Sequence, residues 1–175
     1  CILAPKLVET GRHPNIEIIA NAEVEEITGE AGHFRVTVKR RLTYVDPKKC
    51  TSCGRCAEVC PIETPSAFDE GFCGRKAVYL PFPQAIPLSY TVDRKACIGC
   101  GRCAAICPAG AIGFSPDEVS VSELDVGSVV LAPGFEKFDP GKLKEFGYGT
   151  YPNVVTSIEL ERMLSASGPT KGAVL

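Results

Sequence analysis

The chain has 175 residues, 45% of them hydrophobic, which is enough for one ordinary domain or two small ones. Its formal net charge is -2, from 19 basic and 21 acidic residues, and gives no reason to expect a nucleic acid or an anionic membrane as partner. No apolar stretch approaches the roughly 20 residues that a membrane-spanning helix requires. The chain is therefore expected to be soluble.

The N-terminal part of the chain predicts a short helix followed by a β-hairpin. Residues 4–10 can form a helix that Gly11 ends. Apolar side chains then alternate with polar ones at positions 24–27 and again at 34–38. The segment between them, residues 29–32, contains two glycines and fits a turn.

Eight of the ten cysteines fall into two copies of one pattern. In each copy, two residues separate the first three cysteines from one another, three residues precede the fourth, and a proline follows it. This is the ligand spacing of paired 4Fe-4S clusters. The two runs are Cys50, Cys53, Cys56, Cys60 and Cys97, Cys100, Cys103, Cys107.

In two-cluster ferredoxins the last cysteine of each run ligates the cluster of the opposite run. We therefore predict two 4Fe-4S clusters with crossed ligands. One set is Cys50, Cys53, Cys56 and Cys107. The other set is Cys97, Cys100, Cys103 and Cys60. Their role is to hold and tune the clusters, and no catalytic residue is predicted.

The two runs are also copies of each other outside their cysteines. When residues 44–61 are placed over 91–108, an offset of 47, 11 of 18 positions are identical. Ligation dictates some of these matches but not Val45, Asp46 and Lys48, which recur at the same offset. The similarity therefore favours an internal duplication, with two equivalent half-units packed together.

Two other interpretations of the cysteines are weaker. Zinc prefers separated pairs of ligands, usually with histidine, whereas His13 and His33 are both remote in sequence from the runs. Disulfides suit small secreted chains, and no signal peptide is recognisable. We expect a reducing, cytoplasmic compartment. Cys73 is interpreted as a bystander thiol, and Cys1 remains open between a structural cysteine and a ligand of a further cluster.

The remaining elements are predicted from local patterns. Three prolines within Leu80–Pro87 indicate an extended segment without helix or central strand. Ala109–Ile112 predicts a short strand, and Val126–Leu131 predicts a fully buried strand. Thr156 and the glutamate three residues later form a capping box for a last helix, which Gly168–Pro169 ends.

Several segments, most of them outside the cysteine runs, resemble the A subunit of heterodisulfide reductase. They are Leu3–Val8, Gly11–Ile16, Pro81–Pro87, the second run Cys97–Ile112, and Tyr151–Thr156. The cysteine runs alone occur in many ferredoxins, so the flanking segments carry the more specific part of the likeness. The resemblance covers essentially the whole chain.

This resemblance implies an α+β fold in which a two-cluster bacterial-ferredoxin-like domain is inserted into an α/β thioredoxin-reductase-like flavin domain. Residues 1–43 would supply flavin-domain strands, 44–118 the ferredoxin-like domain, and 119–175 a returning strand and helix. The chain begins at Cys1 and ends within an apolar segment, so we expect a piece of a larger polypeptide. The family's FAD fingerprint is absent from it, so FAD is expected in the parent protein and not in this chain alone.

The predicted function is electron transfer through two 4Fe-4S clusters. The resemblance adds flavin-based electron bifurcation in the parent, with the other heterodisulfide reductase subunits and an electron-donating hydrogenase or dehydrogenase as partners. The chain alone is expected to have no turnover of its own. The alternative is a structural or oxygen-sensing iron-sulfur module, which two adjacent clusters make less favourable because one metal site would serve a structural task.

Overall fold

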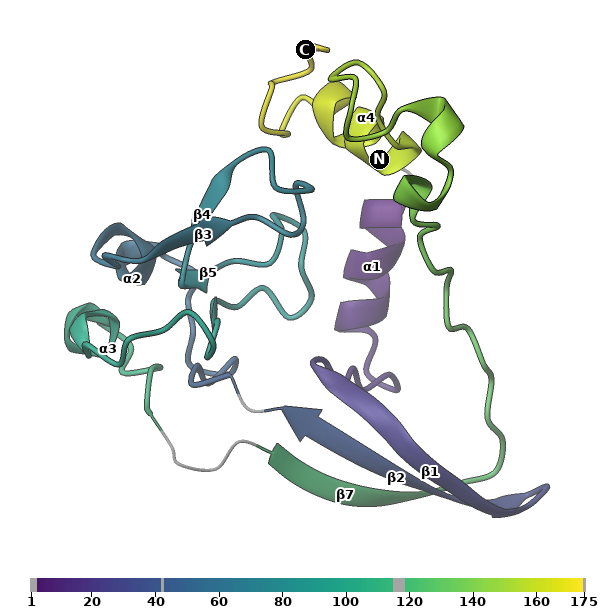
Figure 1. The fold of residues 1–175 in the computed structure, drawn as a ribbon. Helices are drawn as coiled ribbons and strands as arrows, with labels where there is room; N and C mark the ends of the chain where they lie inside the picture. Colours follow the sequence, from purple (N-terminus) through teal and green to yellow (C-terminus); the bar gives the residue numbers. More distant parts are fainter. Residues whose placement is uncertain (1–2, 42, 115–118, 175) are drawn as a thin grey trace. The chain divides into compact units, whose positions relative to one another are not determined.

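The computed structural model describes residues 3–41, 43–114 and 119–174 (Figure 1). The chain packs as two compact units. The first unit comprises Cys1–Glu63 and Lys76–Val130, and the second comprises Thr64–Arg75 and Leu131–Leu175. Among the described residues, no helix has the length and apolar character needed to cross a membrane.

The first unit begins with the predicted helix and hairpin. Helix α1 (Leu3–Arg12) is confirmed, although it continues through the glycine that was expected to end it. Strands β1 (Ala22–Glu30) and β2 (His33–Arg41) pair antiparallel and confirm the hairpin. Gly29 has φ +95°, and a Cβ atom there would lie 2.2 Å from the His33 carbonyl oxygen. The turn therefore requires glycine at this position.

The third strand of this sheet lies where no strand was predicted. Strand β7 (Val119–Val126) pairs antiparallel with β2 and gives the order β1-β2-β7. The predicted buried strand Val126–Leu131 is wrong, because the strand ends at Val126 and the side chains of Val130 and Leu131 are 89% and 79% exposed. In residues 119–126 apolar and polar side chains alternate, which is a weaker signal for a strand than the apolar run that follows. These residues nevertheless form the strand, because they pair with the edge of β2.

The cysteine runs fold as two similar halves around one small core. Each run contains a short helix, α2 (Arg55–Glu58) in the first and α3 (Arg102–Ile106) in the second. Strand β5 (Val78–Tyr79) pairs with β6 (Thr91–Val92), while Val45 forms a single antiparallel bridge with Ile112. The buried residues between the halves are Val45, Cys56, Val78, Val92, Cys103 and Ala111.

The segments around these halves only partly follow the sequence-based expectations. The short strand predicted over Ala109–Ile112 is reduced to the bridge at Ile112. Gly110 has φ +56°, which breaks the extended conformation in the middle of the predicted strand. Leu80–Pro87 forms neither helix nor strand, as its prolines predicted.

The second unit contains the C-terminal helix and a hairpin loop that lies between the cysteine runs in sequence. The loop is flanked by strands β3 (Glu63–Pro65) and β4 (Gly74–Lys76), which pair with each other. Two 3-10 turns, η1 (Pro140–Lys142) and η2 (Lys144–Phe146), precede helix α4 (Ser157–Leu164).

Both halves of the predicted capping box are present at the start of helix α4, on Thr156 and Glu159. The predicted end of this helix at Gly168–Pro169 is wrong, because Ser165 is already extended. The Thr170 hydroxyl donates to the Met163 carbonyl at 2.7 Å and so satisfies a carbonyl of the last turn without further helix.

A mostly buried ion pair joins helix α4 to the hairpin loop within the second unit. The Arg162 guanidinium donates to Asp69 Oδ1 from Nη2 at 2.8 Å and from Nε at 3.1 Å, and the two side chains are only 12% and 18% exposed. The guanidinium also lies 4.4 Å from the centre of the Phe68 ring. Burial opposes ionisation of Asp69, but hydrogen bonds from Arg162, Ser66 and Cys73 outweigh it and lower the pKa of this carboxyl.

We expect Arg162→Met to loosen the second unit, because it leaves the Asp69 carboxylate buried without its cation. The loss should be on the order of 2 kcal/mol and should appear as faster hydrogen exchange of the α4 amides. Lys137→Met, which removes a more exposed ion pair with Glu70, is the matched control and should change exchange less.

The pH dependence of this effect follows from the lowered pKa of Asp69. A lowered folded-state pKa contributes stability above the unfolded pKa, and that stability is lost as the pH falls through the folded value. The difference between wild type and Arg162→Met should therefore be full at pH 7 and shrink below about pH 4. A difference that stays constant down to strongly acidic pH would contradict the ion pair's role.

Candidate metal centres

The structure gathers the eight cysteines of the two runs into two crossed sets. One small space is lined by Cys50, Cys53, Cys56 and Cys107. A second small space is lined by Cys97, Cys100, Cys103 and Cys60. We call these the first and the second cysteine site. Their members are those that the spacing predicted for each cluster, and ligation by these thiols remains a prediction.

The backbone of each run turns in the same way to present its cysteines. The Asp46 carboxylate accepts the Lys48 N–H at 2.9 Å, and its carbonyl accepts the Cys50 N–H at 3.0 Å. In the second run the Asp93 carboxylate accepts the Lys95 N–H at 3.1 Å, and the Asp93 carbonyl accepts the Cys97 N–H at 2.9 Å. The recurrence of aspartate in both runs is therefore explained by this turn, a role that the duplication alone did not reveal.

A glycine in the left-handed conformation starts the short helix of each run. Gly54 has φ +83° before α2, and Gly101 has φ +73° before α3. Other residues rarely adopt this conformation. It turns the chain between the second and third cysteines, so that the third, Cys56 or Cys103, points into the core and is 8% exposed.

The cysteines of a set differ in burial and in acidity. Burial raises the pKa of Cys56 to about 11 and also raises the pKa of Cys103. Cys53 and Cys100 are exposed. Because a metal binds the thiolate, ligation at the two buried positions must displace protons, so assembly of the sites is linked to pH.

Hydrogen bonds reach the sulfurs at other positions. The Ala111 N–H donates to Cys107 Sγ at 3.3 Å in the first site, and the Gly99 N–H donates to Cys97 Sγ at 3.4 Å in the second. Burial opposes ionisation of Cys50, but hydrogen bonds from the backbone of Tyr90 and Ser52 and from the Ser89 and Ser52 hydroxyls outweigh it and lower its pKa.

The donor sets fit iron-sulfur clusters. Four thiols surround each space, and thiolates are the usual ligands of these clusters. Within residues 3–41, 43–114 and 119–174, no three His, Cys, Asp or Glu side chains converge on one point as the ligands of a single ion do. The four cysteines of each set instead line one common space, as thiolates that each bind one iron of a four-iron cluster would.

The other two cysteines do not belong to these sites. Cys73 lines neither site, and its thiol donates to Asp69 Oδ2 at 3.4 Å. Burial and the neighbouring carboxylate raise its pKa, which makes it a weak nucleophile. Cys1 lies outside the described residues. The nine described cysteines are all free thiols.

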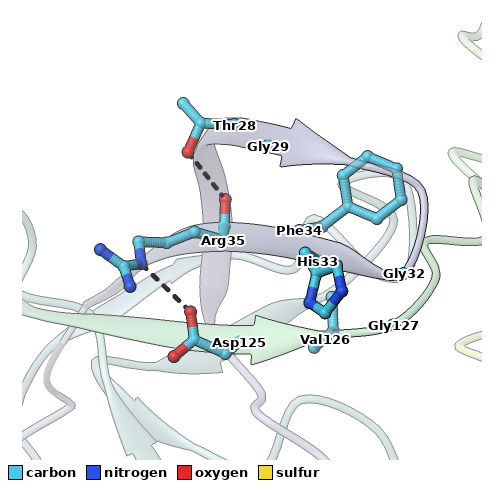
Figure 2. A pocket seen from close by; sticks show the side chains of 9 residues that line it. All are labelled: Thr28, Gly29, Gly32, His33, Phe34, Arg35, Asp125, Val126 and Gly127. Atoms are coloured by element: carbon cyan, nitrogen blue, oxygen red, sulfur yellow. Dashed lines mark hydrogen bonds and ion pairs between the residues drawn. The ribbon is translucent and has the colours of Figure 1, made fainter.

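A hollow of about 620 Å³ at the hairpin end of the sheet is a weaker candidate (Figure 2). Figure 2 shows Arg35 pointing across to Asp125, to which its Nε donates at 3.1 Å, while Thr28 Oγ1 donates to the Arg35 carbonyl at 3.5 Å. The charged groups are thus paired with each other. We assign no chemistry to this hollow.

Comparison with known families supports the interpretation of the cysteine-bearing segment. Residues 49–112 match the model of the 4Fe-4S dicluster domain family. This range contains both cysteine sites. This segment is therefore a two-cluster iron-sulfur domain, which binds two 4Fe-4S clusters.

The whole chain is similar to one component of a methanogen enzyme. It is 50% identical over 177 residues to the A subunit of the H2:CoB-CoM heterodisulfide,ferredoxin reductase of Methanothermobacter marburgensis, covering 100% of the chain and 26% of the relative. It is 56% identical over 178 residues to the first of two iron-sulfur A subunits of CoB-CoM heterodisulfide reductase in Methanopyrus kandleri, with coverages of 99% and 26%.

A third relative is the A subunit of the H2/formate:CoB-CoM heterodisulfide,ferredoxin reductase of Methanococcus maripaludis, 53% identical over 98% of the chain and 26% of the relative. The chain belongs to the heterodisulfide reductase A-subunit family. It spans about a quarter of the length of these relatives.

The crossed arrangement can be tested by single substitutions. We expect Cys107→Ser to perturb the same spectroscopic centre as Cys53→Ser, because both residues line the first site. Electron paramagnetic resonance of the reduced chain would identify the centre. Cys73→Ser is the control and should leave both centres intact, whereas a Cys107→Ser variant that altered the Cys100 centre would refute the crossing.

Proposed function

We propose that this chain relays single electrons through two 4Fe-4S clusters within a heterodisulfide-reductase-type flavoprotein. The first cluster is held by Cys50, Cys53, Cys56 and Cys107, and the second by Cys97, Cys100, Cys103 and Cys60. A bound 4Fe-4S cluster accepts and returns one electron at a time. The cysteines hold the clusters side by side, and the surrounding backbone and side chains set how readily each is reduced.

The observation that carries this proposal is that the two cysteine sites share one core. Cys56 from the first site and Cys103 from the second belong to the same group of buried residues, together with Val45, Val78 and Val92. Two redox centres packed against a common core are suited to exchange electrons with each other. A purely structural role would need only one of them, which is why the alternative of a structural or oxygen-sensing module is less favoured.

We further propose that the segments flanking the clusters belong to a flavin domain. In this proposal residues 1–43 and 119–175 are parts of a thioredoxin-reductase-like FAD domain, and 44–118 is the inserted electron-transfer domain. The pairing of β2 with β7 supports an insertion, because these strands lie on either side of the cysteine-bearing segment in sequence and are neighbours in one sheet.

The partners proposed for the parent protein follow from the names of the relatives. Those names include H2, formate, ferredoxin and the CoB-CoM heterodisulfide. We propose that the parent assembles with the other heterodisulfide reductase subunits and with a hydrogenase or dehydrogenase that supplies electrons. Flavin-based bifurcation belongs to that assembly, and this chain contributes the relay.

The proposal predicts about eight irons per chain and two reversibly reducible centres. Anaerobic iron and acid-labile sulfide analysis would measure the first, and a redox titration followed by electron paramagnetic resonance the second. Four irons, or zinc in their place, would contradict the assignment. Eight irons in centres that decompose on reduction would instead favour the structural or sensing alternative.

The isolated chain should bind FAD weakly or not at all and reduce no disulfide, while its clusters still accept electrons from a strong reductant. No Gly-rich phosphate loop or pair of catalytic nucleophile and base is readable in its sequence. Flavin fluorescence after gel filtration with added FAD, and a disulfide-reduction assay with reduced viologen, would measure both. Stoichiometric flavin retained by the chain would overturn the prediction.

A further inference from the structure

The internal duplication allows the two cysteine sites to be compared position by position, and their linings differ. Thr51 and Ser52 line the first site together with Tyr90. At the offset of 47, the residue that corresponds to Thr51 is Ile98, which lines the second site together with Phe114. The first site is thus bordered by hydroxyl groups where the second is bordered by hydrocarbon.

The Tyr90 hydroxyl reaches the loop that presents the first cysteines. A Cβ atom built on Gly54 would lie 3.3 Å from Tyr90 Oη. A Cβ atom on Gly101, the equivalent glycine of the second run, would meet nothing within 4 Å. A phenolic oxygen is therefore placed beside the first loop, between Cys53 and Cys56, whereas no tyrosine is among the described residues that line the second site.

Hydrogen bonds from two serines involve the segment that carries Tyr90, and one of them joins this segment to the first loop. The Ser52 hydroxyl donates to the Leu88 carbonyl, and the Ser89 hydroxyl donates to the Tyr90 carbonyl at 3.0 Å. The Tyr90 ring packs on the buried core between the two halves. Both serine hydroxyls also lie within reach of Cys50. The segment that precedes the Tyr90 ring is thus bonded to Ser52, which lines the first site.

This difference bears on how easily each cluster is reduced. Reduction adds one negative charge, which a nearby hydroxyl donor stabilises and an apolar lining does not. The arginines that line the sites do not create the difference, because Arg55 and Arg102 occupy equivalent positions and each lines its own site. Backbone N–H groups reach sulfurs in both sites, from Ala111 to Cys107 in the first and from Gly99 to Cys97 in the second. Cys50 of the first site receives further hydrogen bonds from the backbone of Tyr90 and Ser52.

We propose that Tyr90 raises the reduction potential of the cluster in the first cysteine site above that of the second, so that a single electron given to the chain resides in the first. This rests on the proposed function and assigns the relay a direction. In the transfer step one electron leaves the second centre and one enters the first. No bond is made or broken, and a partner that reduces the second centre supplies the electron.

The test is a redox titration of Tyr90→Phe, which removes only the phenolic oxygen. The midpoint potential of the first centre should fall by about 59 mV, which corresponds to a tenfold change in its reduced-to-oxidised ratio. The second centre should not move. Tyr44→Phe is the matched control, because Tyr44 packs on the same core but lines neither cysteine site. It should leave both potentials unchanged.

The centres are assigned with Cys53→Ser and Cys100→Ser, each of which alters the signal of its own site. Iron analysis separates two failures. If wild-type chain holds eight irons but the first centre is not the higher in potential, or Tyr90→Phe does not lower it, this inference is overturned while the proposed relay stands. A wild-type chain without two reducible iron-sulfur centres overturns the proposed function itself.

A Tyr90→Phe variant that lost iron would still leave a decisive measurement on the wild type. Electron-nuclear double resonance of the singly reduced chain, compared in H2O and D2O, detects exchangeable protons close to the cluster. We expect the electron on the first centre, with an exchangeable proton coupling from the Tyr90 hydroxyl. An electron on the second centre would overturn the inference, and so would the absence of that coupling from the first.

Discussion

The exchange of the fourth cysteine between the two runs constrains the rest of the cysteine-bearing segment. Cys107 can reach the first site only if the second half lies directly against the first, and Cys60 imposes the same condition in the opposite direction. The backbone pairings follow this exchange. Val45, at the start of the first half, bridges Ile112 at the end of the second, and β6 of the second half pairs with β5 of the first. Few buried apolar side chains connect the halves, so a segment of this size depends on metal-thiolate bonds for much of its stability.

The features that could be predicted from the sequence are those marked by residue types at a fixed spacing. Cysteine positions follow from the ligand geometry, the hairpin from alternation, and the start of α4 from the reciprocal bonds of Thr156 and Glu159. The strand expected after Val126 failed because an apolar run shows that burial is favoured but not where a partner lies. Residues 119–126 form strand β7 because the edge of β2 is open for pairing. The two strands are far apart in sequence, since the paired residues Arg41 and Val119 are separated by 78 positions.

Contacts over long sequence distances were beyond local patterns altogether. Asp69 and Arg162 are separated by 93 residues, and nothing around either residue indicates the other. Their pairing places the hairpin loop of residues 64–75 in the second unit, although this loop interrupts the cysteine-bearing segment in sequence. The second half of the duplication has no such insertion, since its chain passes from Pro108 to Ala111 in a short turn. The inserted loop therefore gives the first half a contact with helix α4, the ion pair of Asp69 with Arg162, which the ligation of a cluster does not require.

The two halves of the duplication have kept some residues in common and differ at others. Positions that shape the loop have stayed the same: the glycines before α2 and α3 keep the left-handed conformation, and Asp46 and Asp93 form the same turn. Positions that border the sulfurs without shaping the loop have diverged, with Ser52 opposite Gly99 at the offset of 47. Two identical sites would share an electron equally and give a relay no direction. The backbone of the two halves must remain similar to bind two similar clusters. A difference in the side chains that line the two sites can still make one cluster easier to reduce, so that the electron resides there.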